Sequence, residues 1–471
     1  MRARALIVAL VLVAPACRER KPAPAPRPSP RPGNSLNVLL VTIDTLRADH
    51  LGIYAYMRNT SPRIDALARQ GAVFDRAYTY WPKTRGSMAI MLTGRRPSQN
   101  GYSKAHPLLL DFNPTLASVL KEAGYVTAAV VDNPNVAAAN GYAKGFDTYR
   151  ETWEEKSLAT ETDRARAITE TAVAFLAKAR PDRPFFLWLH YVNPHAPYAP
   201  PPPYDTAFLD AAARAGPRLR TVPGLHGGIP KQWAVPGQDR LGYYVAQYDG
   251  EIAAVDEQVG RVMDALRDSG AAGRTVVMLT SDHGESLGEH DYYFDHGEDV
   301  FEPSLAIPLI VLAPGLKPGI RVDAFASTLD VVPTLLDAVK VSYPPDLAGT
   351  SLLPIARGEG AGPPRLFAQN DRNLSATWDR RYKVVATPLG NGRRLALYDR
   401  ARDPGETADR SRALPDELRA QTRALEQHLE RADREWAVTH RLTEGAKGEG
   451  PMSAEACEKL KALGYVQECA P

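Results

Sequence analysis

Residues 275–285, TVVMLTSDHGE, join a short apolar segment to a run of polar side chains. The segment Thr275–Thr280 is rich in β-branched residues, which predicts a buried strand. The polar run begins where that strand ends, with Ser281, Asp282 and His283. Ligands bind at the carboxyl ends of the strands in an open parallel sheet, so these side chains are candidates for a functional site.

Two earlier stretches have the same form. Asn37–Ile43 is an apolar, β-rich run that leads into Asp44, and Phe185–Tyr191 leads into Asn193-Pro194-His195. Three separate strands are therefore expected to direct oxygen and imidazole donors to one edge of a sheet. These donors bind divalent cations, so the set predicts a metal site. Each motif alone is a weak indication, because an aspartate after a strand is as often a turn or cap residue.

The segments between these strands predict helices. Alternation of strands and helices favours an α/β fold with a mostly parallel central sheet flanked by helices. The stretches 197–203 and 223–237 are expected as irregular insertions that line the mouth of the site. The other expected elements are helices over Ser61–Gln70, Thr115–Ala123, Ala165–Ala179, Leu241–Asp268 and Pro415–Trp436, and strands over Thr127–Val131 and Ala306–Leu312.

The composition is that of a globular protein. The chain has 471 residues, of which 44% are hydrophobic and 24% charged, with a formal net charge of +2. These values exclude long disorder and coiled coil, and they give no electrostatic footprint for nucleic acid. Three cysteines in the whole chain exclude a disulfide-rich scaffold and a cysteine-built metal cluster. The sequence does not indicate an oligomeric state.

The start of the chain has the pattern of an export signal. Two arginines precede an apolar run, and small residues then lead to Cys17. This pattern resembles the lipobox of a bacterial lipoprotein, with a signal peptide over 1–16 and a lipid on Cys17. The expected location is the bacterial cell envelope, anchored in the membrane by that lipid. Plain cleavage that leaves a periplasmic protein is the alternative. Residues 17–35 are rich in proline and predict an extended tether.

A fourth candidate element is WPKTRGSMAIMLTGR, residues 81–95. Thr84 is expected on a loop, and Ser87–Leu92 at the start of a short helix. Helix N-termini present free N–H groups, which suit an anion, and Arg95 would add a fixed cation. A capping threonine and a surface arginine are the alternative interpretation.

Together these motifs resemble the sulfatase family of the alkaline-phosphatase superfamily. The resemblance is carried in order by VTIDTLRADHLG (41–52), NPHAPY (193–198), TSDHGESLGEH (280–290) and IPLIVLAPG (307–315). It implies an alkaline-phosphatase-like catalytic domain over 36–343 and a smaller C-terminal α+β subdomain over 344–471. It also implies metal-dependent hydrolysis of sulfate, phosphate or phosphonate esters of small molecules, glycans or lipids.

The resemblance assigns metal ligands residue by residue. Asp44 and Asp282 match the metal-binding aspartates of the family, and His283 stands where many sulfatases have asparagine. The Asp–His pair is similar to phosphonate monoester hydrolases and to phospho-group transferases of the same superfamily. One divalent ion, calcium, manganese or zinc, is implied, with Thr84 as a further ligand.

The nucleophile is the main departure from the family. Counting back from Thr93-Gly94 places Thr84 where sulfatases have the cysteine or serine that becomes formylglycine. No cysteine lies between Cys17 and Cys457, so a formylglycine made from cysteine is excluded. The resemblance to the transferase and phosphodiesterase branches implies that a metal-activated Thr84 attacks the ester directly.

Other residues near this position have roles by resemblance. His195, with Asn133 and Lys104, is expected to contact the oxygens of the transferring group. His296 is expected to protonate the leaving oxygen.

Two alternatives remain open: the expected lipid anchor fits the first, and Gly86 and Met88, which replace the usual proline and arginine of the family, favour the second. One is a phospho-group transferase that acts on envelope lipid or glycan. The other is a catalytically impaired protein that binds anions.

The remaining cysteines are Cys457 and Cys469. In an oxidising compartment we expect them to form a disulfide that closes a small loop around Leu463-Gly464-Tyr465.

Overall fold

The computed structural model describes residues 35–444, 452–466 and 468–469. The expected signal peptide over 1–16, Cys17 and the tether up to residue 34 lie outside the described residues. Within the described part of the chain, no helix combines the length and apolar character needed to cross a membrane.

Eight strands form one central sheet. They are β1 (Asn37–Ile43), β2 (Ala72–Tyr78), β3 (Val126–Val131), β4 (Thr148–Glu151), β5 (Phe185–Tyr191), β8 (Thr275–Ser281), β11 (Leu309–Leu312) and β12 (Ile320–Ser327). Their order is β12-β2-β11-β8-β1-β5-β3-β4. Neighbours pair in parallel except at β11, which runs antiparallel to both β2 and β8. The sheet is therefore mostly parallel, as predicted.

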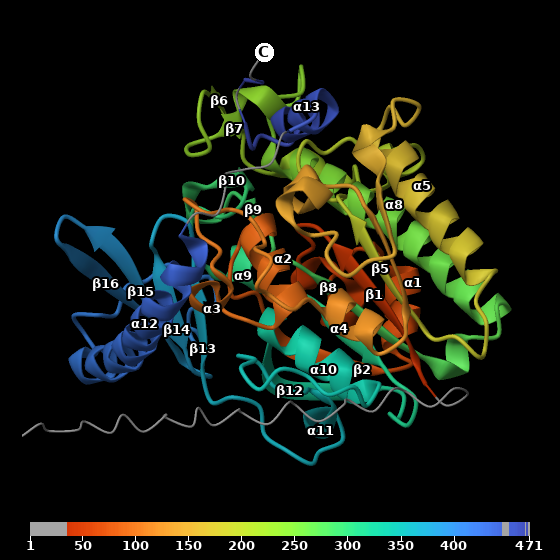
Figure 1. The fold of residues 1–471 in the computed structure, drawn as a ribbon. Helices are drawn as coiled ribbons and strands as arrows, with labels where there is room; N and C mark the ends of the chain where they lie inside the picture. Colours follow the sequence, from red (N-terminus) through yellow and green to blue (C-terminus); the bar gives the residue numbers. More distant parts are fainter. Residues whose placement is uncertain (1–34, 445–451, 467, 470–471) are drawn as a thin grey trace, which may run out of the picture.

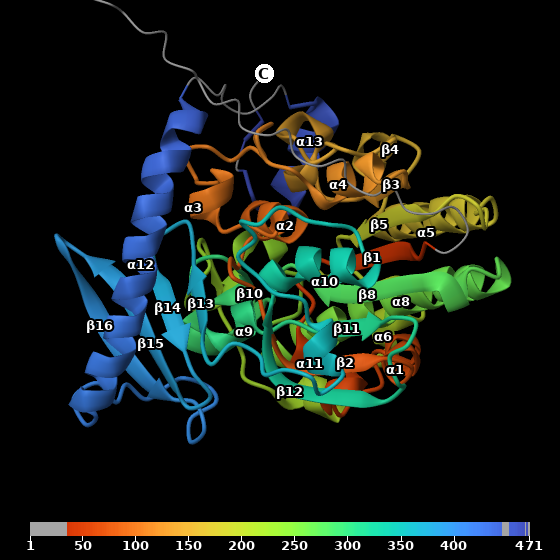
Figure 2. The same cartoon turned by 60° about the horizontal axis from the view of Figure 1, so that its bottom comes forward.

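Helices cover both faces of this sheet (Figures 1 and 2). One face carries α2 (Thr84–Thr93), α4 (Leu116–Glu122) and α10 (Val331–Ala338), and the other α1 (Pro62–Ala68), α5 (Glu161–Leu176) and α8 (Leu241–Asp268). Alternate residues of β1 enter the two cores, with Val38 and Leu40 in the first and Leu39 and Val41 in the second. Full burial of one such side chain contributes about 1.5–3 kcal/mol, so the central strands stabilise the sheet from both sides.

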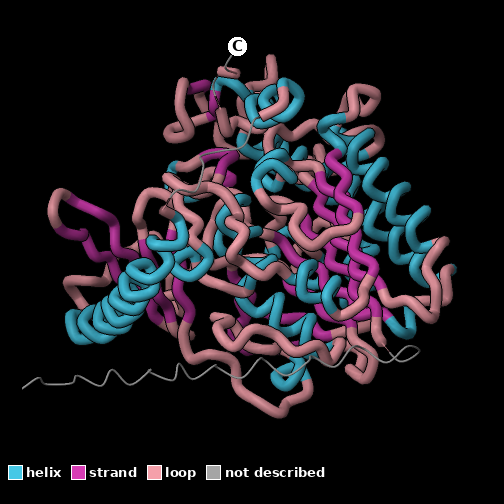
Figure 3. The backbone as a smooth tube through the Cα atoms, in the orientation of Figure 1, coloured by secondary structure: helices cyan, strands magenta, loops and turns pink. Residues whose placement is uncertain are grey.

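The C-terminal part forms a smaller α+β subdomain. Its antiparallel sheet consists of β13 (Leu366–Gln369), β14 (Ser375–Trp378), β15 (Tyr382–Leu389) and β16 (Gly392–Asp399), with α12 (Pro415–Thr443) packed across it. Leu425 of α12 packs against Val384, Ala386 and Leu397 of the sheet. Figure 3 shows these strands as a group separate from the central sheet.

The last helix, α13 (Ala454–Ala462), leaves the subdomain and packs on the main domain. Figure 1 shows it in blue near the β6–β7 insertion, which consists of β6 (Thr221–Val222) and β7 (Ile229–Pro230). Lys459 Nζ donates to Glu161 Oε1 of α5 at 2.5 Å. Cys457 and Cys469 form the predicted disulfide.

The predicted and observed bounds coincide for β1, β5 and α8. Helix α5 begins four residues before the predicted start, because Thr160 caps it and accepts from the Asp163 backbone N–H. The segment predicted as the strand Ala306–Leu312 forms a strand only from Leu309, and that strand is β11, which is antiparallel.

The short α-helices and β-strands not yet named are α3 (Pro97–Asn100), α6 (Tyr204–Ala207), α7 (Ala211–Ala215), α9 (Glu302–Leu305), α11 (Leu353–Ala356), β9 (Ser286–Leu287) and β10 (Tyr293–Asp295).

Candidate active site

The polar groups that follow the strands meet at one edge of the sheet. Asp44 follows β1, and Asp282 and His283 follow the end of β8. Asn133 and His195 lie just beyond β3 and β5. The strands β8, β1, β5 and β3 are consecutive in the sheet and parallel, so their carboxyl ends lie side by side.

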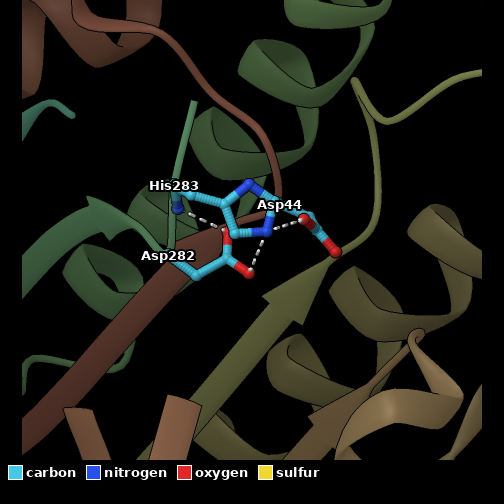
Figure 4. A group of neighbouring side chains, drawn as sticks. All are labelled: Asp44, Asp282 and His283. Carbon is cyan, nitrogen blue, oxygen red and sulfur yellow. Dashed lines mark hydrogen bonds and ion pairs between the residues drawn. The ribbon is translucent and has the colours of Figure 1, made fainter. Parts of the chain in front are cut away.

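Asp44, Asp282 and His283 form a compact buried group (Figure 4). His283 Nε2 lies 3.6 Å from Asp44 Oδ1 and 3.2 Å from Asp282 Oδ2. One ligand atom from each residue lies within 4.8 Å of the other two. All three side chains are fully buried.

The hydrogen bonds of this group leave three acceptor atoms facing one another. His283 Nδ1–H donates to the Gly284 carbonyl at 3.0 Å, and burial lowers the pKa of His283 to about 3. The neutral ring therefore presents a bare Nε2. Asp44 Oδ1 and Asp282 Oδ2 are buried and have no hydrogen-bond donor among the described residues. Burial raises the pKa of both aspartates, and the charge of Asp282 raises the pKa of Asp44 further. A divalent cation satisfies all three atoms, so these residues fit a metal ion.

Thr84 adjoins this group at the first position of α2. Its Oγ1 is buried and lies 3.2 Å from His283 Nε2. Ser87, one turn further along α2, donates its hydroxyl to the Asp282 carbonyl at 2.7 Å. The helix is thereby tied to the loop that carries two of the metal-site residues. Thr84 is helical rather than on the loop where the sequence predicts it, and α2 begins three residues before Ser87.

Two further histidines point toward Thr84. His195 Nδ1–H donates to the Ala196 carbonyl at 2.6 Å, and burial lowers its pKa to about 4, so its Nε2 is an acceptor. His296 contacts Glu285 Oε1 through Nδ1 at 3.2 Å and turns Nε2 toward the same space. Burial lowers the pKa of His296 and raises that of Glu285. A protonated Glu285 can therefore donate to Nδ1, which leaves the His296 proton on Nε2.

Tyr465, from the end of the chain, occupies the space between these side chains. Its hydroxyl has three partners: Thr84 Oγ1 at 2.9 Å, His195 Nε2 at 3.0 Å and His296 Nε2 at 3.1 Å. The sequence prediction places Tyr465 in the disulfide loop and assigns it no role in the site.

Three other predicted site residues have different environments. Asn133 Nδ2 donates to Asp44 Oδ2 at 2.6 Å, so it orients a metal-site carboxylate. Lys104 lines a cavity of about 270 Å³ that Tyr465 also lines. Arg95 is not brought to the site by the structure. It follows the C-cap of α2, at the opposite end from Thr84, and pairs with Asp346 at 2.7 Å.

The sequence interpretation also leaves out His190 and Glu285. His190 belongs to β5, and its Nε2 lies 3.7 Å from Asp44 Oδ2, beneath the metal site. A histidine inside an otherwise apolar buried strand is the signal that points to it. Glu285 is fully buried in the quoted DHGE motif, and its spacing two residues after His283 is its signal. Tyr465 has no comparable local signal.

Comparisons with known proteins identify two matching family models and several relatives. The family model described as Sulfatase matches residues 36–341, and the model described as N-sulphoglucosamine sulphohydrolase, C-terminal, matches residues 288–434. The chain is 26% identical over 415 residues to arylsulfatase K of Xenopus laevis, with 77% of each chain covered. It is 25% identical over 412 residues to a Δ4,5-hexuronate-2-O-sulfatase of Bacteroides thetaiotaomicron, covering 79% of this chain and 83% of that one.

Solved structures show the same fold. The crystal structure of a phosphonate monoester hydrolase of Agrobacterium radiobacter superposes with a TM-score of 0.70 and 22% identity. The superposition covers 85% of this chain and 96% of that chain.

Proposed function

This chain belongs to the sulfatase family and is a hydrolase of sulfuric or phosphoric esters, and we propose that Thr84 is its nucleophile beside a divalent metal ion. One observation carries the proposal. The Thr84 hydroxyl lies 3.2 Å from His283 Nε2, which itself faces two buried carboxylate oxygens without a donor in the described part of the chain. A hydroxyl in this place is positioned for activation and for attack on an ester.

Asp44, Asp282 and His283 would hold the ion together with Thr84 Oγ1. When bound, a divalent cation lowers the pKa of a hydroxyl and withdraws charge from the transferring group. Carboxylate, hydroxyl and imidazole donors are compatible with calcium, manganese or zinc. Asn133 keeps Asp44 in place through its 2.6 Å hydrogen bond.

The histidines supply the proton chemistry. A negatively charged ester near His195 favours the protonated ring, so we infer that His195 takes up a proton on Nε2 as the ester binds. The protonated Nε2 then donates to an oxygen of the transferring group. With its proton on Nε2, His296 would deliver that proton to the leaving oxygen while a protonated Glu285 passes its own proton to Nδ1, so that the ring stays neutral.

The second half of the reaction favours phosphorus over sulfur. Attack by Thr84, ionised with loss of its hydroxyl proton to solvent, forms an ester on Thr84 and breaks the bond to the leaving oxygen, which takes a proton from His296. Water must then attack that ester directly, because a threonine ester has no second hydroxyl through which to collapse. This requirement favours phosphate or phosphonate esters as substrates. An acceptor hydroxyl in place of water would make the protein a phospho-group transferase.

The purified protein tests this function. Metal content is measured first, followed by turnover of an aryl sulfate, an aryl phosphate diester and an aryl phosphonate. We expect bound metal, turnover of at least one phosphorus ester, and a loss of at least about 10³-fold in kcat for Thr84→Ala, the size expected when a nucleophile is removed. Thr84→Ser keeps the hydroxyl and is the matched control, which we expect to retain activity. Unchanged turnover in Thr84→Ala would exclude the nucleophile, and bound metal without any turnover would favour the anion-binding alternative.

We also propose that the protein is exported and anchored by a lipid on Cys17. The lipobox-like sequence before Cys17 supports this location, and the Cys457–Cys469 disulfide suits an oxidising compartment. Metabolic labelling with a radioactive fatty acid tests the anchor. We expect label in the wild-type protein and none in Cys17→Ser, and equal absence of label in both would contradict the lipid.

A further inference from the structure

The end of the chain reaches into the site through a structured segment, residues 453–466, which we call the C-terminal lid. Helix α13 forms most of it. Lys459 is buried and contacts Glu161 at 2.5 Å and Asp132 at 3.8 Å. Ser453 donates its hydroxyl to Glu154 Oε1 at 2.5 Å. These polar contacts, with the buried Leu460 and Leu463, hold the lid against the segments that follow β3 and β4 and against the start of α5.

The turn after α13 directs Tyr465 inward. Gly464 has φ +79°, and a Cβ built on it would lie 2.8 Å from the Trp233 ring. Only glycine combines this left-handed backbone with so close an approach to Trp233. The Cys457–Cys469 disulfide closes the loop around this turn.

The Tyr465 oxygen lies where an ester must place its reacting group. It is 2.9 Å from Thr84 Oγ1 and within 3.1 Å of both His195 Nε2 and His296 Nε2. A reacting atom in a productive complex stands about 3–3.5 Å from its nucleophile. Tyr465 and the transferring group therefore cannot occupy the site together.

The ring of Tyr465 also separates the site from the adjoining cavity. That cavity of about 270 Å³ is lined by Lys83, Lys104, Leu460 and Tyr465, among others, and by none of Thr84, His195 and His296. Lys83 Nζ stands 5.8 Å from the centre of the Tyr465 ring. Lys83, Arg85 and Lys104 outnumber Asp371 in this lining, so the cavity has a net positive charge beside the Tyr465 ring.

We propose that the C-terminal lid is autoinhibitory: the Tyr465 hydroxyl takes the place of the transferring group, and substrate enters only when the lid moves away. This inference rests on the proposed function, because that function assigns the three partners of Tyr465 to attack, anion contact and leaving-group protonation. The lid competes with the anionic group, so its removal strengthens binding of that group.

The test compares binding and turnover in the full mature chain. The variants are Tyr465→Phe, which removes the hydroxyl, and Tyr465→Ala, which also removes the ring. Tyr343→Ala is the matched control, because Tyr343 is exposed and lies outside the site. The probes are inorganic phosphate, whose dissociation constant is measured by calorimetry, and an aryl phosphonate for KM and kcat.

If molecules with a closed lid outnumber those with an open lid by about ten to one, the apparent affinity for phosphate falls about tenfold. We therefore expect Tyr465→Ala to lower both the phosphate dissociation constant and KM about tenfold, with kcat not reduced and Tyr343→Ala unchanged. Tyr465→Phe should change in the same direction. Unchanged phosphate binding in Tyr465→Ala, or a fall in kcat with an unchanged KM, would overturn the proposal.

Hydrogen exchange gives a readout that does not depend on turnover. In the wild-type protein, saturating phosphate should increase amide exchange over residues 453–466, and no increase there would contradict the lid. Lys459→Ala, which alters the anchor but not the site, should lower the phosphate dissociation constant in the same direction if the Tyr465 variants fail to fold.

The outcomes separate the two proposals. Tighter phosphate binding in the Tyr465 variants without any ester turnover would support the lid and reject the proposed function. Thr84-dependent turnover with phosphate binding unchanged by Tyr465→Ala would support the function and reject the lid.

Discussion

At the scale of single residues, the site contains two buried carboxylates that the described residues satisfy only in part. Asp44 and Asp282 lie beside a neutral His283, and one oxygen of each has no donor among the described residues. Burial disfavours two adjacent carboxylates strongly. The two buried carboxylates lower the stability of the metal-free protein. When a cation binds, the same two groups supply the favourable binding energy.

Asp44→Asn tests this balance. The substitution removes one of two repelling charges, so the metal-free variant should unfold at a temperature equal to or above that of the metal-free wild type. Metal at 100 times its dissociation constant stabilises a folded protein by about 2.7 kcal/mol, and this gain should be largely lost in the variant. Thermal unfolding with a chelator and with manganese measures both effects. Equal stabilisation of Asp44→Asn and wild type by the metal would contradict the assignment of Asp44.

Glu251 on α8 gives a pH-dependent prediction away from the metal. It is buried and accepts from Asn193 Nδ2 at 2.6 Å and from the Ala199 N–H at 2.9 Å. Burial, with a smaller contribution from Glu161, raises its pKa from 4.5 to about 8. The folded state therefore keeps a proton that the unfolded state loses. The contribution of Glu251 to stability is complete below pH 4.5 and is lost as the pH rises through about 8.

Glu251→Gln should reduce this loss. One such proton accounts for a slope of at most about 1.4 kcal/mol per pH unit. The variant should therefore lose less stability than wild type between pH 4.5 and about 8 in denaturant titrations. Asn193 Oδ1 has no hydrogen-bond partner among the described residues, so a flipped Asn193 amide can accept from the new glutamine. Parallel pH profiles for the two proteins would show that Glu251 is ionised in the folded state.

At the scale of elements, the strand ends of the sheet and the N-terminus of α2 build the site, and α13 closes it. The strands β8, β1 and β5 are fixed by parallel pairing over most of their lengths. The lid is instead one short helix and a turn, held by the buried Ala456, Leu460 and Leu463 and by a few polar contacts. A short terminal helix buries fewer apolar side chains than the core strands and opens more readily.

Gly464→Ala should displace the lid. Gly358 is the matched control, because it also has positive φ, at +77°, but its added Cβ meets nothing within 4 Å. Both substitutions carry the backbone cost of a left-handed alanine, about 1 kcal/mol, but only the one at position 464 collides with Trp233. Faster proteolysis within 453–466 in Gly464→Ala alone is the expected result. Equal rates of proteolysis within 453–466 in Gly464→Ala and Gly358→Ala would show that the contact with Trp233 does not hold the lid.

At the scale of the whole molecule, the two sheets are joined by a shared core. Tyr78, Val300 and Leu305 of the main domain pack with Trp378 and Val385 of the subdomain. Near this core the buried Lys383 pairs with Glu406 at 2.8 Å, and Arg400 pairs with Glu302 at 2.8 Å. Separating the parts would expose the apolar residues and break the pair between Arg400 and Glu302, which crosses between the two parts.

We therefore expect the folded chain to unfold in one cooperative transition. A chain ending at residue 343 should aggregate, because it lacks the half of this core that the subdomain supplies. Calorimetry of the full chain tests whether it unfolds in one transition. The solubility of the truncated chain tests whether it aggregates. Two separate calorimetric transitions would contradict the coupling.

Much of this arrangement could be predicted from local sequence. The strands β1, β5 and β8 are apolar runs followed directly by polar residues, and that pattern locates Asp44, Asp282, His283 and His195 at one sheet edge. Positions that depend on tertiary packing could not be found in this way. Tyr465 meets Thr84 across 381 residues because buried apolar side chains of α13 and the Lys459–Glu161 pair hold this helix on the main domain.

Arg95 is a residue that the sequence prediction places in the site and the structure places away from it. It is close to Thr84 in sequence, but the intervening helix α2 has 10 residues. A helix of that length separates its ends by about 15 Å, so the cation cannot reach the reacting groups from there.

The most direct test of the account is to identify the residue that carries the ester during turnover. The wild-type protein is mixed with an aryl phosphonate, quenched in acid during turnover, digested and analysed by mass spectrometry. We predict that the peptide containing Thr84 gains the mass of the transferred group, that Thr84→Ala gains nothing and that the modified site is Thr84 itself. Turnover with no modification of Thr84, and with Thr84→Ala as active as wild type, would contradict the central claim.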